Sequence, residues 1–173
     1  MKKIVFLLFA LLFSCQSGLK LHTEMYKDKP ILVGKAHLQD LETKPYNEWF
    51  DANYRDYRPD NEVVDKLKSK INNYRFTVIL GTWCGDSQEQ VPALFKVLDR
   101  AGYKYPVELY CVPRKYKNYK PVERFNLIRV PTIILYKDKR EKGRIIEYPM
   151  DRIETDLWQI ISSNTYRHEL QQG

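Results

Sequence analysis

Apolar and polar residues alternate along the chain with periods that predict a regular α/β domain from residue 60 onward. Two nearly continuous apolar runs, at 75–80 and 107–112, are typical of strands buried on both faces. Further strands are expected at 132–136 and 144–148, and helices at 60–71, from residue 84 to Gly102, at 121–126 and from Asp151 onward. The expected order, α-β-α-β-α-β-β-α, predicts a mixed sheet of about four to five strands flanked by helices.

Several residues mark the ends of these helices. Asp60 is expected to cap the first helix and Gly102 to end the second. Asp151 with Glu154 three residues later resembles a capping box for the last helix. Residues 137–143 are expected to form a charged turn between the last two strands.

The part of the chain before residue 60 is less regular. Residues 30–34 predict a short strand, and residues 45–57 predict a helix with an aromatic stripe, interpreted as a packing surface. Residues 16–29 are polar and mixed, which favours a tether. The predicted organisation is a leader at 1–14, a tether at 15–29, an aromatic-rich N-terminal extension at 30–59 and the α/β domain at 60–173.

The leader has the pattern of an export signal. Lys2 and Lys3 precede an apolar run from Ile4 to Phe13, which is too short for a membrane span. The following Ser14-Cys15 resembles the lipobox of bacterial lipoproteins, in which the cysteine is lipidated and becomes the N-terminus. The alternative is an incidental cysteine in a signal peptide cut elsewhere. Lipidation at Cys15 would anchor the chain in a bacterial cell envelope, where disulfides persist, with the periplasmic side preferred over the cell surface.

Composition and charge narrow the function classes. Of the 173 residues, 43% are hydrophobic and 13% aromatic, which excludes wholesale disorder. Loss of the leader lowers the formal charge from +7 to +5. A basic group at Arg114, Lys115, Lys117 and Lys120 is interpreted as a solvated face or a contact for anionic headgroups, and no nucleic-acid partner is expected.

Two segments together carry a family resemblance. A buried strand leads into Trp83-Cys84 at the start of a helix, and Val130-Pro131 opens a later strand. In these features the chain resembles the thioredoxin-like family over roughly residues 60–163. The resemblance implies that the Trp-Cys-Gly segment lies at the edge of the sheet. It also implies a cis peptide bond at Val130–Pro131 beside the reactive sulfur, with the Val130 backbone free to pair with an extended substrate.

The predicted place of Cys84 suits a nucleophile. The N-terminus of a helix offers unpaired N–H groups and a partial positive charge, which favour the thiolate that attacks disulfides. Trp83, Gly85 and Asp86 are expected to shape the site around it. The charge of Asp86 opposes the field of the helix.

Two departures from the family pattern indicate a monothiol chemistry. Ser87 stands where the second cysteine of the usual pair is found, and Val78 stands where thioredoxins carry a buried acid that helps deprotonate that partner. Cys84 would then form mixed disulfides, accept a small thiol or isomerise disulfides, with Ser87 and Pro131 as further site residues. Cys111 leaves two interpretations open, a buried structural residue or a resolving thiol.

The leading hypothesis is thus an exported, membrane-anchored thiol–disulfide exchange protein, an oxidoreductase or isomerase of monothiol type. Its partners would be protein or small-molecule thiols and disulfides, and the chain is expected to be a monomer without cofactor or metal. The main alternative is a redox-inactive thioredoxin-like binding module. A thiol peroxidase is a third hypothesis, although the Thr-x-x-Cys arrangement of peroxiredoxins is missing.

Overall fold

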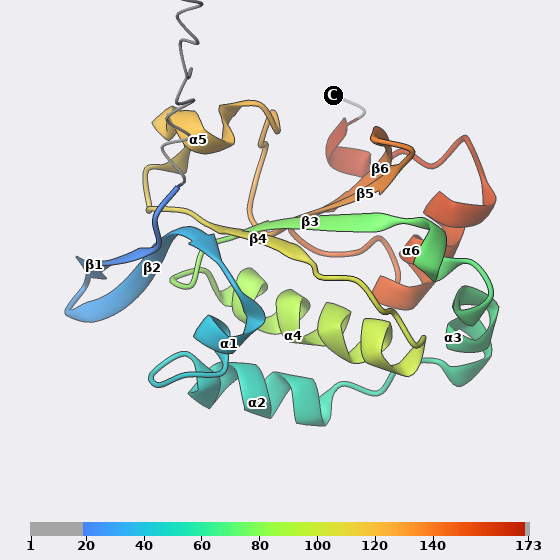
Figure 1. The fold of residues 1–173 in the computed structure, drawn as a ribbon, viewed down its shortest axis with the longest axis horizontal. Helices are drawn as coiled ribbons and strands as arrows, with labels where there is room; N and C mark the ends of the chain where they lie inside the picture. The colour runs from blue at the N-terminus through green and yellow to red at the C-terminus, as the bar shows by residue number, and fades with distance from the viewer. Residues whose placement is uncertain (1–18, 172–173) are drawn as a thin grey trace, which may run out of the picture.

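Six strands form one mixed sheet in the computed structural model, which describes residues 19–171 (Figure 1). Across the sheet their order is β1-β2-β4-β3-β5-β6; β3 and β4 pair in parallel, and the other neighbours are antiparallel. The two strands expected to be buried therefore lie side by side in the middle. In chain order the strands are β1 (His22–Tyr26), β2 (Lys29–Ala36), β3 (Arg75–Leu80), β4 (Glu108–Cys111), β5 (Thr132–Lys137) and β6 (Arg140–Ile146).

Helices cover both faces of this sheet (Figure 1). The α-helices are α1 (Leu38–Leu41), α2 (Asn47–Asp56), α3 (Asn61–Lys68), α4 (Gly85–Arg100), α5 (Lys120–Glu123) and α6 (Ile153–Ser162). Single 3-10 turns lie at Ile71–Asn73, Tyr116–Asn118 and Glu169–Gln171. Within residues 19–171, no helix has the length and hydrophobicity needed to cross a bilayer.

The alternation of side chains in β3 divides the core in two. Phe76, Val78 and Leu80 face a large cluster that includes residues of α2, α3, α4 and α6. Ile79 faces a smaller cluster, built from Tyr110 of β4 and from residues in and around α5. The predicted order of elements from residue 60 onward is confirmed, and the fold is the expected mixed α/β sheet flanked by helices.

Two of the predicted helix ends are confirmed. The side chain of Asp60 accepts hydrogen bonds from the backbone N–H groups of Glu62 and Val63, which α3 leaves without partners in its first turn. After α4 ends at Arg100, Gly102 takes a φ of +68°, a left-handed conformation that glycine adopts without steric cost. Local sequence therefore sets these two boundaries.

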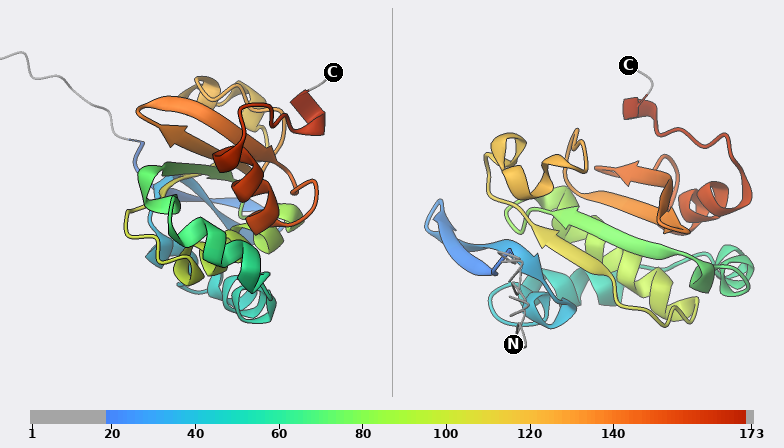
Figure 2. Two further views of the ribbon diagram at one scale, coloured as in Figure 1. Left: turned by 90° about the vertical axis from the view of Figure 1, so that its right-hand side faces the viewer. Right: turned by 45° about the horizontal axis from the view of Figure 1, so that its top comes forward.

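The predicted tether is wrong for the residues that the structure describes. Residues 22–26 form β1, which pairs with β2 in a hairpin that projects from the rest of the sheet (Figure 2). Lys27 and Asp28 make its turn with φ angles of 49° and 60°. Turns with two positive φ angles are usually signalled by Asn or Gly, so Lys-Asp gave little sign of one. The hairpin also explains why the sheet has six strands instead of four to five.

The last strand and the last helix begin elsewhere than expected. β6 starts at Arg140, because a turn at Asp138 and Lys139, both with positive φ, lets the two strands pair at once. Asp151 does not cap α6: the N-cap is Arg152, without a side-chain cap. Glu154 is instead fully buried and binds groups outside its own helix.

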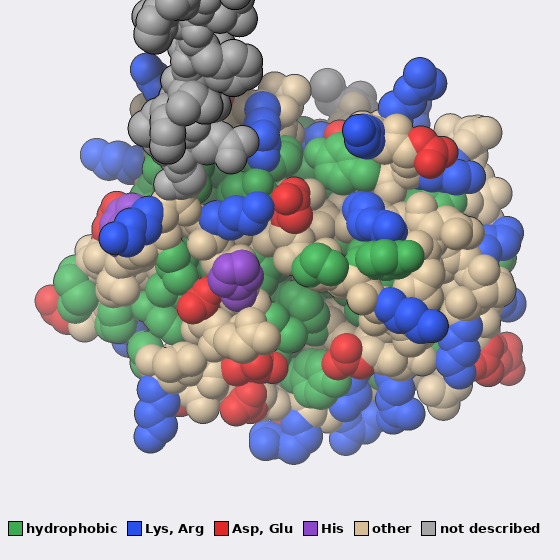
Figure 3. All heavy atoms as spheres, viewed as in Figure 1, with side chains coloured by type: hydrophobic (Ala, Val, Ile, Leu, Met, Phe, Trp, Pro, Cys, Tyr) green, Lys and Arg blue, Asp and Glu red, His purple; other side chains and the backbone are tan. Residues whose placement is uncertain are grey.

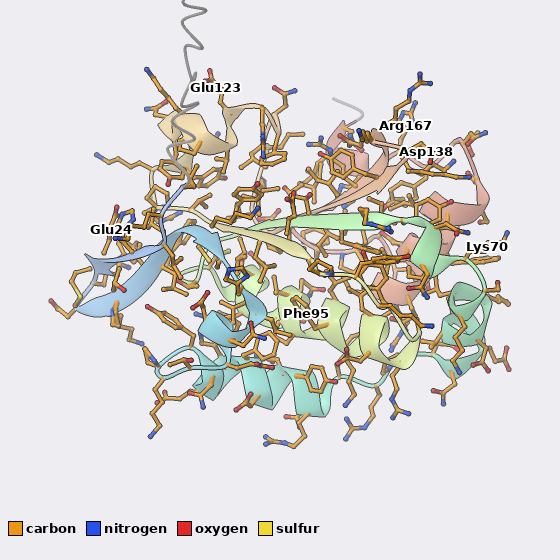
Figure 4. All side chains as sticks on the ribbon, viewed as in Figure 1. Glu24, Lys70, Phe95, Glu123, Asp138 and Arg167 are labelled. Atoms are coloured by element: carbon orange, nitrogen blue, oxygen red, sulfur yellow. The ribbon has the colours of Figure 1, made fainter. Side chains whose placement is uncertain are left out.

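The aromatic-rich segment at 30–59 belongs to the same core as the rest of the domain. Phe50 of α2 is buried, and its ring lies 6.0 Å from that of Phe95, which Figure 4 shows between α4 and α2. At the end of the segment, the hydroxyl of Tyr57 donates to the carboxylate of Glu154 at 2.6 Å. The interpretation of the stripe as a packing surface is therefore confirmed.

Candidate active site

A tight turn between β3 and α4 holds Cys84 at the start of the helix. The backbone N–H of Cys84 donates to the carbonyl of Gly81 at 2.9 Å, and Cys84 is the N-cap residue of α4. The hydroxyl of Thr82 accepts a hydrogen bond from the backbone N–H of Leu32 at 3.0 Å. This bond ties the turn of the cysteine to β2, the second strand of the N-terminal hairpin.

Trp83 folds back over the same turn. Its indole N–H donates to the carbonyl of Val112 at 2.9 Å, beyond the end of β4. A Cβ at Gly81 would come within 2.6 Å of the Trp83 ring, so this approach requires glycine. Sequence reasoning did not single out Gly81, although a glycine directly after a buried strand marks a close approach of this kind.

The sulfur of Cys84 is half-buried and lies between two acceptors. It is 3.4 Å from the carbonyl oxygen of Val130 and 3.7 Å from a carboxylate oxygen of Asp86. The Val130–Pro131 peptide bond is cis, as the family resemblance implies. The structure therefore brings Cys84 and Asp86 together with the Val130–Pro131 segment, although Val130 is 46 residues from Cys84 in the chain.

Ser87 and Val78 occupy interior positions. Ser87 is completely buried, and its hydroxyl oxygen accepts a hydrogen bond from the backbone N–H of Gly81 at 3.2 Å. Val78 packs in the large core cluster, on the face of the sheet covered by α4. In this structure Ser87 therefore stabilises the turn that presents Cys84.

Cys111 lies in the core away from the site. It belongs to the large cluster, whereas Cys84 packs against the smaller cluster on the other face of the sheet. Both thiols are free, and burial raises the pKa of the Cys111 thiol to about 12. This geometry favours the buried structural interpretation of Cys111 over a resolving thiol.

Cys84 opens into a groove of about 1240 Å³. It is lined by Tyr26, Lys27 and Lys29 of the β1–β2 hairpin, which form its hairpin wall, and by the segment 128–130 with Glu147. Trp83, Gly85 and Asp86 also line the groove, so the residues expected to shape the site do reach it. A Cβ on Gly85 would meet nothing within 4 Å, which shows that the groove is open at this point.

An aromatic and cationic cluster surrounds Trp83, next to the cysteine. The rings of Trp83 and Tyr116 are stacked with centroids 6.2 Å apart, and Tyr26 meets Trp83 edge-on at 6.5 Å. The guanidinium of Arg114 lies 4.4 Å from the centre of the Trp83 ring. A hydrogen bond from Arg114 lowers the pKa of the Tyr26 phenol. Sequence reasoning missed Tyr26 and Tyr116, and interpreted the basic group with Arg114 as a solvated face or a contact for anionic headgroups.

Among residues 19–171, no group of three or more His, Cys, Asp or Glu side chains could hold a metal ion. Lys and Arg side chains are spread over the face shown in Figure 3, with Asp and Glu among them. Cys15 and the predicted leader lie outside the described residues.

Comparisons with known proteins agree with this architecture. A family model described as thioredoxin matches residues 36–155, so the match begins inside the predicted extension. A crystal structure of a protein of unknown function from Pseudomonas aeruginosa has 15% identity and a TM-score of 0.52, covering 75% of this chain and 82% of its own. Mitochondrial thioredoxin 3 from Saccharomyces cerevisiae, in its oxidized form, has 21% identity and a TM-score of 0.38, covering 64% of this chain and 97% of its own. No curated protein matches the chain.

Proposed function

Since the chain belongs to the thioredoxin family, as the match over 36–155 shows, we propose that it is a thiol–disulfide exchange protein with Cys84 as its single nucleophile. The observation that carries this proposal is the placement of the sulfur. Cys84 is half-buried at the start of α4, inside an open groove, and 3.4 Å from the Val130 carbonyl. A helix start favours a thiolate, and the groove gives a partner access to it.

The proposed reaction needs no cofactor. The Cys84 thiolate attacks one sulfur of a partner disulfide; the partner's S–S bond breaks, a mixed disulfide forms, and the released thiolate takes up a proton. A second thiol, from the partner or a small molecule, then attacks the mixed disulfide and regenerates Cys84. When both thiols belong to one partner, the net change is isomerisation, and neither an oxidant nor a reductant is consumed.

The test is to trap the mixed disulfide. Incubating the native chain with glutathione disulfide should produce one glutathione adduct, which peptide mapping by mass spectrometry should locate at Cys84. Cys84→Ser should abolish this adduct and the refolding of a scrambled disulfide protein, and Cys111→Ser should retain both. A wild-type chain that forms no adduct, or a Cys84→Ser variant that still refolds the substrate, would contradict the proposal.

A redox-inactive binding module is the second candidate, and Ser87 favours it. The position of the second cysteine is filled by a buried hydroxyl whose oxygen accepts a backbone hydrogen bond. A dithiol cycle within this motif is therefore absent. Full biological activity of the Cys84→Ser variant would favour this candidate over exchange.

We further propose that the protein is exported and anchored to a bacterial membrane through lipid on Cys15, with the domain on the periplasmic side. The support comes from the sequence pattern, in which an apolar run of signal-peptide length ends at Ser14-Cys15. Expression in a bacterium with radiolabelled palmitate should label the wild-type chain and the Cys84→Ser variant. The label should disappear in Cys15→Ala, and labelling of that variant would contradict the proposal.

A further inference from the structure

The groove around Cys84 carries an unbalanced charge. Lys27 and Lys29 lie on the hairpin wall. Arg114 and Lys117, from the segment that follows β4 in the chain, also line the groove, and all four side chains are exposed. Within residues 19–171, none of the four forms an ion pair. A wall of unpaired cations raises the local concentration of an anionic partner and favours its docking.

The groove has fewer acidic groups to offset these cations. Glu147 is paired with Arg129 at 2.9 Å, so this pair is neutral as a whole. Glu48 and Asp86 remain, outside the hairpin wall. The cationic wall is therefore available to carboxylates supplied by a partner.

Several contacts join the wall to the turn that carries Cys84. Trp83 is anchored to the Val112 carbonyl and stacked on Tyr116, and Arg114 lies over its ring. The bond from Leu32 to Thr82 fixes β2 to the turn of the cysteine. Because both sets of contacts join the wall to the nucleophile, carboxylates bound there would lie at a defined place relative to the sulfur.

The size of the groove favours an extended peptide over a small thiol. Small-molecule pockets are commonly about 300–1,000 Å³ and enclosed, whereas this groove measures about 1240 Å³ and is open. Ile128 also lines the groove, is 39% exposed and offers contact to an apolar side chain. The groove thus combines an apolar contact, the nucleophile and a cationic wall.

We propose that the wall formed by Lys27, Lys29, Arg114 and Lys117 selects extended, acidic peptide segments for disulfide exchange at Cys84. This inference rests on the proposed function and names its substrate class. The segment carries acidic residues near its disulfide-bonded cysteine, and their carboxylates lie against the hairpin. Cys84 attacks the cysteine sulfur of that segment, and the thiol that had been bonded to it leaves with a proton.

Two matched peptides test the proposal on the full chain. Each is short and carries a central cysteine activated as a 2-pyridyl disulfide, flanked by glutamates in one peptide and by glutamines in the other. Attack by Cys84 releases 2-thiopyridone, whose absorbance gives the rate. At an ionic strength of about 0.02 M the acidic peptide should react about tenfold faster, and at about 0.5 M this ratio should fall to about twofold.

Charge reversal identifies the wall. Lys27→Glu with Lys29→Glu should bring the ratio of acidic to neutral rates to about one or below. The matched control is Lys66→Glu with Lys104→Glu, which changes the net charge equally. Both control residues are exposed, on α3 and just after α4, at the end of the molecule away from the hairpin (Figure 1). The control should keep the wild-type ratio.

The other possible results separate a failure of the acidic selection from a failure of the exchange function. If the wild-type chain reacts equally fast with both peptides at low salt, the acidic selection is wrong and the exchange function stands. If Cys84 reacts with neither peptide, both proposals fail. If glutathione disulfide depends on Lys27 and Lys29 as steeply as the acidic peptide does, the wall binds small anionic thiols and the peptide assignment is wrong. The salt dependence of the wild-type ratio needs no variant, so it tests the selection of acidic peptides by charge even if a charge reversal impairs folding.

Discussion

The sulfur of Cys84 lies 3.4 Å from the carbonyl oxygen of Val130, which is 46 residues away in the chain. The start of α4 supplies the sulfur, and the residue before Pro131 supplies the oxygen. A protonated thiol can donate to this carbonyl, and a thiolate cannot. In the proposed reaction the same carbonyl becomes available to an extended partner once Cys84 has lost its proton.

Asp86 should slow the reactions of Cys84. Its carboxylate lies 3.7 Å from the sulfur, where its negative charge repels a thiolate. Asp86→Asn is therefore expected to increase the rate of alkylation by iodoacetamide at pH 7 by roughly three- to tenfold, since two like charges about 4 Å apart repel each other by about 1 kcal/mol in water. The rate is measured as loss of free thiol, with mass spectrometry to confirm Cys84 as the modified residue.

Glu89 provides the matched control on the same helix. It is exposed and lies farther along α4, and its replacement by Gln removes the same charge. Glu89→Gln should change the alkylation rate by less than about twofold, because an exposed charge at longer range is screened by solvent and salt. Equal rate increases in both variants would mean that net charge, and not the position of Asp86, controls the thiol.

Cys111 should be inert in the folded protein. Burial raises the pKa of its thiol to about 12, so very little thiolate forms at neutral pH, and the side chain is fully buried. Iodoacetamide at pH 8 should therefore modify Cys84 in the native chain and Cys111 only after denaturant is added. Native modification of Cys111 at the rate of Cys84, or a Cys84–Cys111 disulfide after mild oxidation, would contradict this placement.

The local sequence predicted the helices and strands that carry Cys84 better than it predicted the walls of the groove beside it. The strand at 75–80 and the cap at Asp60 follow from apolar runs and single side chains, which act over a few residues. Glu154 looked like part of a capping box, but its partners, Tyr57 and the backbone of Asp60, are about a hundred residues away in sequence. No local pattern records such a pairing.

The groove, too, depends on contacts between residues far apart in sequence, which local patterns do not predict. Its nucleophile was predicted from a strand followed by a helix start, a signal contained in a few residues. Its hairpin wall depends on a Lys27-Asp28 turn without the usual residues for positive φ, and on a bond from Leu32 to Thr82 across 50 residues. Arg114 looked like part of a solvated patch because its contact with Trp83 exists only in the folded chain.

Installing a second cysteine should convert the site to a dithiol. Ser87 lies one helical turn after Cys84, and residues three apart in a helix face each other at a separation compatible with a disulfide. In the Ser87→Cys variant, mild oxidation should join the new thiol to Cys84, seen as a loss of two hydrogens in the mass and as protection of Cys84 from iodoacetamide. Gln90→Cys, farther along the same helix, should form no such bond. Failure of Ser87→Cys to close would mean that the buried Ser87 position cannot reach Cys84.

Glu154 should contribute stability that depends on pH. Its buried carboxylate accepts hydrogen bonds from Tyr57, the backbone of Asp60 and Arg152, at 2.6 Å, 2.8 Å and 2.7 Å. Burial alone would raise the pKa of Glu154, but these bonds outweigh it and hold the pKa below its usual value. The contribution is thus fully present above the unfolded pKa of about 4.3 and is lost as the pH falls through the folded pKa.

Glu154→Gln removes the charge and keeps the shape of the side chain. The variant should lower the free energy of unfolding by about 1–3 kcal/mol at pH 7, and the difference from wild type should shrink as the pH falls below about 4. Unfolding of the wild type and the variant by denaturant, between pH 7 and a pH below about 4, measures this difference in free energy. Asp151→Asn tests the capping box expected from the sequence: Asp151 is exposed and should change stability by less than about 0.5 kcal/mol. If Asp151→Asn lowered the free energy of unfolding more than Glu154→Gln does, Asp151 would be the residue that caps α6, as the sequence pattern predicts.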